Sequence, residues 1–218
     1  MRIIAGRFKK RRLRAVRGLT VRSTADRVKE SLFNILAGEI PHAVVLDLFC
    51  GAGSLGLEAL SRGADRAVFV DRLNVALACT RHNVETLGVE RESAVIRMDA
   101  LTALRALERR GEVFSLIIAD PPYGERWPVR TLTAVAESGC RSETGILVIE
   151  HHKKDLPGDP PPGFSLWTSR RFGDTVFTIW RWEPRPTTTT AGRANKDKET
   201  SDGGEQPGIP PGHLPGNV

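Results

Sequence analysis

Cysteine is scarce in this 218-residue chain, and the three cysteines, Cys50, Cys79 and Cys140, lie far apart. They form no CxxC pair, which excludes a disulfide framework and a zinc site of the usual ligand spacing. We therefore expect three small buried thiols and no metal site.

Long apolar runs are also missing, since no stretch approaches the roughly 18 uninterrupted apolar residues that a membrane span requires. Residues 1–6 lead straight into charged sequence, without the apolar core of a signal peptide. We expect a soluble, cytoplasmic monomer with no membrane contact. The length suits one well-buried catalytic domain.

Acidic residues are absent from residues 1–22, although the whole chain has 26 of them and a net charge of +6. A cluster of positive charge suggests a polyanionic partner, and we favour contact with phosphates. The alternative is a solvated basic tail. The basic residues of this segment are Arg2, Arg7, Lys9, Lys10, Arg11, Arg12, Arg14, Arg17 and Arg22.

Short apolar runs alternate with amphipathic segments through the middle of the chain. The expected helices are 24–36, 55–62, 73–87, 101–109 and 128–138. The expected strands are 44–49, 67–71, 94–98, 114–119 and 145–150. Strands separated by helices of this length predict a mostly parallel, doubly wound α/β sheet with right-handed crossovers.

The pattern changes after residue 151, where prolines exclude a helix and two β-rich runs follow, 164–170 and 175–182. They meet near Gly173 and Asp174 and predict an antiparallel pair at one sheet edge. Residues 184–218 have too few large apolar side chains to offset the entropy of ordering, which predicts a disordered tail. The domain organisation is thus a basic segment 1–22, a catalytic domain 23–183 and a tail 184–218.

A glycine-rich turn follows the first expected strand, in the motif Asp47-Leu48-Phe49-Cys50-Gly51-Ala52-Gly53-Ser54-Leu55-Gly56. Gly51 and Gly53 allow a ligand to approach the backbone closely, and the helix that follows offers free N–H groups. The spacing to Gly56 also satisfies the dinucleotide fingerprint. The loop alone therefore does not separate NAD from S-adenosylmethionine.

Acidic residues stand at successive strand ends. Asp71 is placed to accept hydrogen bonds from the ribose hydroxyls of either cofactor. Asp47 precedes the glycines, where a carboxylate suits the methionyl ammonium of S-adenosylmethionine better than a pyrophosphate. Met98 could make an apolar contact with an adenine, and the Asp99 carboxylate could accept a hydrogen bond from its amino group. Each Asp could instead cap a helix, but three at one sheet edge favour a shared ligand. Phe49 and Arg72 complete the predicted cofactor set.

The sequence Asp120-Pro121-Pro122-Tyr123 ends the fourth expected strand and indicates the reaction. The lone pair of a purine amine is delocalised into the ring. A carboxylate and a backbone carbonyl that accept its N–H bonds would free that lone pair for attack on a sulfonium methyl group. Two prolines fix the turn, and Tyr123, the one tyrosine in the chain, can stack on the base. We predict that these four residues are catalytic.

Three residues near the fifth strand carry weaker signals. Glu150, at the end of that strand, is a candidate for orienting the substrate. Adjacent histidines in a strand point to opposite faces, so His151 and His152 are expected at the solvent edge and not as a metal pair.

Three segments together resemble the bacterial RsmD-type 16S ribosomal RNA guanine-N2 methyltransferases. They are residues 2–6 with 24–34, the block 47–63, and the Asp120–Tyr123 motif. The resemblance spans residues 1–182 and implies a Rossmann-like class I fold that uses S-adenosyl-L-methionine. It also implies that Asp120 to Tyr123 hold the target base and that Arg22, Thr24 and Arg27 face RNA.

The resemblance implies methylation of N2 of the guanine conventionally numbered 966, in 16S rRNA within an assembling 30S subunit. We expect the base to be extruded into a pocket at Tyr123 while the basic segment grips phosphates. Three alternatives stay open: a methyltransferase for adenine N6 or another planar amine, an NAD-dependent oxidoreductase, and a non-enzymatic RNA-binding assembly factor.

Overall fold

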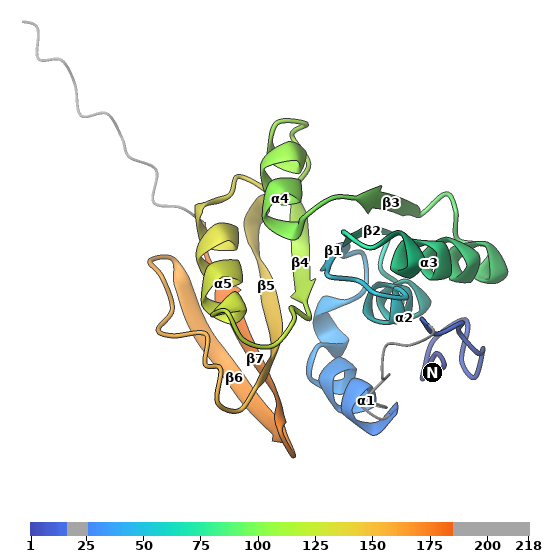
Figure 1. Ribbon diagram of the computed structural model, residues 1–218, viewed down its shortest axis with the longest axis horizontal. Coiled ribbons are helices and arrows are strands. Elements are labelled where there is room, and N and C mark those ends of the chain that lie inside the picture. The colour runs from blue at the N-terminus through green and yellow to red at the C-terminus, as the bar shows by residue number, and fades with distance from the viewer. Residues whose placement is uncertain (17–25, 185–218) are drawn as a thin grey trace, which may run out of the picture. The chain divides into compact units, whose positions relative to one another are not determined.

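The computed structural model describes residues 1–16 and 26–184. Within this part a seven-stranded sheet has the order β3-β2-β1-β4-β5-β7-β6 (Figure 1). The strands are β1 (Val44–Leu48), β2 (Arg66–Asp71), β3 (Ser93–Arg97), β4 (Phe114–Ala119), β5 (Arg141–His152), β6 (Phe164–Phe172) and β7 (Thr175–Trp182).

The strands β1 to β5 are parallel to one another, while β7 is antiparallel to both β5 and β6. The predicted parallel sheet with an antiparallel C-terminal pair is thus confirmed. A dinucleotide-binding sheet has the order 3-2-1-4-5-6 without this insertion of an antiparallel strand.

Helices cover both faces of the sheet, as the doubly wound prediction requires. The helices are α1 (Asp26–Ile35), α2 (Ser54–Ser61), α3 (Asn74–Leu87), α4 (Ala100–Glu108) and α5 (Trp127–Glu137), with a short 3-10 turn, η1 (Ala37–Glu39). One core cluster joins α1, α2 and α3 to one sheet face, and a second joins α4 and α5 to the other. The three cysteines are free and buried, as predicted.

The β5 strand is longer than expected. Its pairing with β4 is irregular between Phe114 and Leu116, but the strand continues past this irregularity to Arg141, which pairs with Phe114. The expectation that His151 lies at the solvent edge is wrong. Its side chain is buried, with Nδ1 3.0 Å from the carbonyl oxygen of His152 and Nε2 2.8 Å from Thr178 Oγ1. The Thr178 hydroxyl on β7 provides the buried ring with a hydrogen-bond partner. The sequence pattern of β5 alone does not reveal this partner.

Residues 1–16 pack against the domain. Ile3, Leu13 and Val16 are buried, and an antiparallel bridge joins Arg2 to Arg12. The buried carboxylate of Glu58, on α2, accepts hydrogen bonds from the backbone N–H groups of Ile4, at 2.8 Å, and Ala5, at 3.0 Å. Apolar burial and backbone bonds therefore fix this segment, while its lysines and arginines stay exposed.

Several predictions concern residues 17–25 and 185–218, which lie outside the described residues. They include the RNA contacts of Arg22 and Thr24 and the disordered tail. The described residues all belong to one compact unit. Among the described helices, none is both long and apolar enough to cross a membrane.

Candidate active site

A cavity of about 1020 Å³ opens at the carboxyl ends of the parallel strands. There β1 lies between β2 and β4, so the strand order reverses, and open α/β sheets bind ligands at such a switch point. In Figure 1, α1 lies beside the carboxyl end of β4. The predicted site residues that line the cavity are Arg27, Phe49, Gly51, Asp71, Arg72, Met98, Asp99, Asp120, Pro121, Pro122, Tyr123 and the substrate-orienting candidate Glu150.

The glycine loop between β1 and α2 is held in place by α3. Gly51 and Gly53 have φ angles of 57° and 78°, which favour glycine. Thr80 Oγ1 donates to the carbonyl of Gly51 at 2.8 Å, and Asn83 Nδ2 donates to that of Ala52 at 2.9 Å. A methyl group added to Gly51 would meet no atom within 4 Å. The backbone at Gly51 is therefore open to a ligand.

Asp47 lies beneath this loop and, like Gly53, is not among the residues that line the cavity. Its Oδ2 accepts a hydrogen bond from the N–H of Gly56 at 2.9 Å. Burial raises the pKa of Asp47 to about 7, and the negative charges of Asp120 and Asp71 contribute to the increase. The hydrogen bond from Gly56 opposes that shift.

Gly56 has no room for a side chain, since an added Cβ would lie 2.4 Å from Phe69 Cε1. The third glycine of the motif thus serves close packing of the helix on the sheet.

Asp71 and Asp99 both line the cavity, and both accept hydrogen bonds from the backbone of nearby loops and helix ends. Asp71 accepts hydrogen bonds from the N–H of Gly51 at 2.9 Å and that of Leu73 at 2.8 Å. Asp99 is the N-cap of α4, and its Oδ1 accepts from the N–H groups of Leu101 and Thr102, both at 3.1 Å. The capping alternative therefore describes Asp99, although the residue also lines the cavity. A carboxylate has two oxygens and about four lone-pair sites, so these bonds leave room for a ligand.

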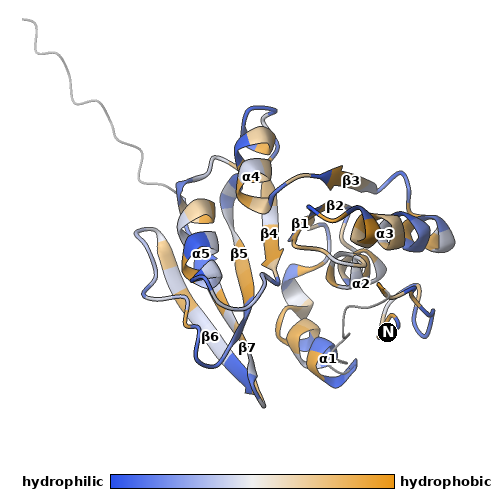
Figure 2. Ribbon diagram, viewed as in Figure 1, coloured by the Kyte–Doolittle hydropathy of each residue, from blue (hydrophilic) through white to orange (hydrophobic). Residues whose placement is uncertain are grey.

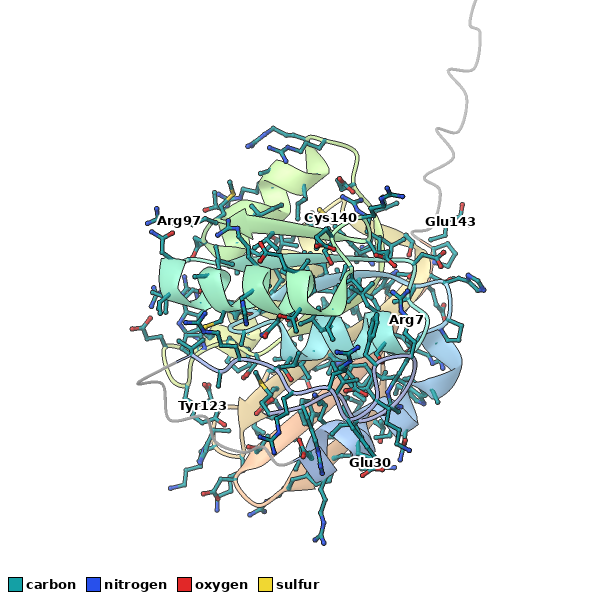
Figure 3. The ribbon with its side chains drawn as sticks, turned by 90° about the vertical axis from the view of Figure 1, so that its right-hand side faces the viewer. Arg7, Glu30, Arg97, Tyr123, Cys140 and Glu143 are labelled. Atoms are coloured by element: carbon teal, nitrogen blue, oxygen red, sulfur yellow. The ribbon has the colours of Figure 1, made fainter. Side chains whose placement is uncertain are left out.

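The Asp120–Tyr123 loop begins directly at the end of β4. The N–H of Asp120 donates to the carbonyl of Leu48 at 3.3 Å, which places the loop beside the end of β1. Tyr123 is 39% exposed and lies at the periphery in Figure 3. Its ring contacts that of His152 edge-on, with centroids 5.5 Å apart. The loop is thus adjacent to the glycine turn and presents an aromatic ring at the cavity.

An aromatic pair forms an apolar part of the cavity wall. Phe49 and Trp127 meet edge to face with ring centroids 5.4 Å apart, and both line the cavity. The guanidinium of Arg130 lies 4.0 Å from the Trp127 ring centroid. Sequence reasoning missed Trp127, because it begins α5 and carried no strand-end signal.

Lys29 was also missed. It is buried, lines the cavity, and its Nζ donates to the carbonyl of Arg2 at 2.7 Å and to Ser54 Oγ at 3.1 Å. The same group lies 3.3 Å from Glu58 Oε2. Burial lowers the pKa of Lys29, while the attraction of Glu58 raises it. The available signal was a lysine three and four positions before the buried Leu32 and Phe33.

The predicted RNA contacts occupy different places. Arg27, on α1, lines the cavity. Arg7 is paired with Glu92 at 2.9 Å. The side chains of the basic cluster on the N-terminal turn are exposed: Lys9, Lys10, Arg11 and Arg12. In residues 1–16 and 26–184, no group of three or more His, Cys, Asp and Glu residues is placed to hold a metal ion.

A family model described as conserved hypothetical protein 95 matches residues 1–181. The chain belongs to this family. It is 42% identical over 158 residues to YlbH of Bacillus subtilis, named as a candidate rRNA methyltransferase, an alignment that covers 72% of this chain and 86% of YlbH. It is 30% identical over 182 residues to ribosomal RNA small subunit methyltransferase D of Haemophilus influenzae, with 83% and 93% covered. The predicted RsmD-type family is therefore confirmed.

The fold agrees with solved structures. A structure described as a candidate methyltransferase, yhhF from Escherichia coli, matches with a TM-score of 0.75 and 28% identity, covering 85% of this chain and 99% of that one. A candidate methylase from Haemophilus influenzae, HI0767, matches with a TM-score of 0.70 and 28% identity, covering 84% and 98%. These matches confirm the Rossmann-like methyltransferase fold.

Proposed function

We propose that this protein transfers a methyl group from S-adenosylmethionine to the exocyclic N2 of a guanine in small-subunit ribosomal RNA. The observation that carries the proposal is the adjacency of the Asp120–Tyr123 loop and the glycine turn in one cavity. The names of the relatives, ribosomal RNA small subunit methyltransferase D among them, support the substrate class.

The residues around the cavity fit S-adenosylmethionine. The cavity volume of about 1020 Å³ exceeds what a cofactor of this size needs. Gly51 has open space where a side chain would stand. Asp71 would hold the ribose, Met98 and Asp99 would contact the adenine, and Phe49 and Arg72 would complete the set. Asp47 would attract the methionyl ammonium through the loop that covers it. When bound, the cofactor supplies an electrophilic sulfonium methyl group.

The protein side of the reaction rests on Asp120 and the diproline turn. The Asp120 carboxylate and the diproline carbonyl would accept the two N–H bonds of the target amine, which draws that nitrogen towards a tetrahedral shape. Tyr123 would stack on the base and hold its plane. Asp120 would also be the nearest acceptor for the proton that the amine must release.

Two features of the fold favour this function over NAD-dependent oxidation. The sheet includes the antiparallel β7 between β5 and β6, which the dinucleotide-binding order lacks. The Asp120–Tyr123 loop at the end of β4 would offer acceptors to an amine, and no such acceptors are needed to transfer a hydride.

Substitution of Asp120 tests the proposal. Transfer of labelled methyl groups to small subunits that lack this modification is measured for the wild type, Asp120→Ala and Asp120→Asn. Loss of the charged acceptor should reduce transfer by at least about 100-fold, while calorimetry with S-adenosylhomocysteine should show nearly unchanged affinity. Asp65→Ala is the matched control, because Asp65 is an exposed carboxylate directly ahead of β2, at the amino-terminal end of the strands and outside the cavity. Full transfer by Asp120→Ala would remove this residue from the mechanism.

A further inference from the structure

A second basic surface borders the cavity, at the end of the β6–β7 pair. It consists of Lys153, Lys154, Arg170 and Arg171, which we call the hairpin surface. All four side chains are exposed. The end of β6 is strongly hydrophilic in Figure 2. None of these residues belongs to the basic N-terminal segment.

The hairpin surface is tied to the Asp120–Tyr123 loop by direct contacts. The N–H of Gly124 donates to Asp155 Oδ2 at 3.1 Å, and the Tyr123 ring packs against His152. The N–H of Lys154 donates to His152 Nδ1 at 3.2 Å. The turn that carries the two lysines therefore has a fixed position relative to the loop that would hold the base.

Arg170 lies on the face of the sheet that carries the cavity. It pairs with Phe177 across β6 and β7, and directly opposed residues of an antiparallel pair project from the same face. Phe177 lines the cavity. Arg170 thus borders the cavity from β6, while Arg27 reaches it from α1.

The four cations of the hairpin surface differ in whether a carboxylate already neutralises them. Lys153 forms an ion pair with Asp174 at 2.8 Å. Throughout residues 1–16 and 26–184, by contrast, no carboxylate lies within 4.0 Å of the cationic groups of Lys154 or Arg170. Exposed cations without a carboxylate partner are the groups that can exchange counterions for phosphates.

We propose that the hairpin surface, through Lys154 and Arg170, binds the RNA backbone on one side of the extruded guanine. This inference rests on the proposed function, because it assumes that the base enters at Tyr123. A nucleotide turned out of its strand has phosphates on both sides, so its backbone needs support on both flanks of the pocket. Arg27 and the basic N-terminal segment would hold one flank and the hairpin surface the other. Direct contact of both flanks would fix the register of the strand, and thus the nucleotide that reaches Asp120.

The test is the salt dependence of RNA binding by the full-length protein. Filter binding of labelled, protein-free small-subunit rRNA is measured across a salt series for the wild type and the double variant Lys154→Gln/Arg170→Gln. Loss of two phosphate contacts to a single strand should lower the slope of log K against log salt by about 1.4, roughly 0.7 per contact. At about 0.1 M salt the affinity should fall on the order of tenfold.

Matched variants separate this role from a general effect of charge. Arg109→Gln/Arg110→Gln removes two exposed charges after α4, in the turn that leads into the amino-terminal end of β4, and should leave the slope unchanged. Lys154→Arg/Arg170→Lys keeps both charges and should have the wild-type slope. Affinity for S-adenosylhomocysteine should be the same in all variants, because none of these residues lines the cavity.

The outcomes distinguish this inference from the proposed function. A wild type that methylates subunits and a double variant with an unchanged slope would overturn the role of the hairpin surface alone. An equal loss in the α4 control would also overturn it. Weaker binding to assembled subunits with unchanged binding to protein-free RNA would assign the surface to a ribosomal protein instead. A wild type that neither binds nor methylates the RNA would overturn both proposals.

Discussion

Replacing Asp47 by asparagine should make the stability of the protein less dependent on pH. The Asp47 carboxyl group is 1% exposed, and burial raises its pKa to about 7, from a usual value of 3.8. Between these two values the folded protein holds a proton that the unfolded chain releases. The unfolded state is therefore increasingly favoured as the pH rises from about 4 to 7, and the stability lost to this group is complete above its folded pKa.

The magnitude follows from the size of the shift. A pKa difference between 3.8 and about 7 corresponds to roughly 4 kcal/mol over the whole interval, at 1.36 kcal/mol per pKa unit. Between pH 5 and pH 8 the wild type should lose roughly 2–3 kcal/mol through Asp47. Asparagine does not titrate, and its side-chain oxygen can still accept from the N–H of Gly56, so the variant should lack this loss.

The assay is urea unfolding of the wild type and Asp47→Asn at pH 5, 6, 7 and 8. Only the difference between the two proteins is used, because the other titrating groups contribute equally to both. Asparagine should become progressively more stabilising, relative to aspartate, as the pH rises. A difference in unfolding free energy that is constant from pH 5 to pH 8 would refute the raised pKa and the burial that explains it.

Two further predictions concern the attachment of the N-terminal segment. Gly6→Ala should destabilise the protein by at least about 2 kcal/mol, because Gly6 has a φ of 80° and an added Cβ would lie 1.8 Å from the carbonyl oxygen of Ser61; urea unfolding measures this, and an unchanged midpoint would contradict it. Glu58→Gln should cost about 3–5 kcal/mol, because it leaves the buried Lys29 without its charge partner. The double variant Glu58→Gln/Lys29→Met should recover part of that loss in the same assay, and strictly additive effects would argue against the pairing.

The sequence was sufficient to predict the sheet, because strands buried on both faces are short apolar runs separated by amphipathic helices. The expected strands 114–119 and 175–182 coincide with β4 and β7. The strand-end rule also brought Asp71, Asp99 and Asp120 to one cavity. The local sequence predicts the position of these three aspartates because each one comes directly after a strand or close to its end.

Long-range polar partners could not be predicted in the same way. Glu58 lies in an apolar stretch of α2, and its backbone partners, Ile4 and Ala5, are 54 and 53 residues away. His151 can be buried because Thr178 Oγ1, on another strand, forms a hydrogen bond with its ring. Whether a buried polar group is satisfied depends on tertiary contacts, so the burial of Asp47 and the cavity position of Lys29 also needed the structure.

The identity of the methylated nucleoside tests the central claim most directly. Small subunits from cells that lack the modification are incubated with the protein and labelled S-adenosylmethionine, and the rRNA is digested to nucleosides for mass spectrometry. We predict label in N2-methylguanosine, abolished by Asp120→Ala. Label in N6-methyladenosine, or no label in RNA at all, would contradict the account.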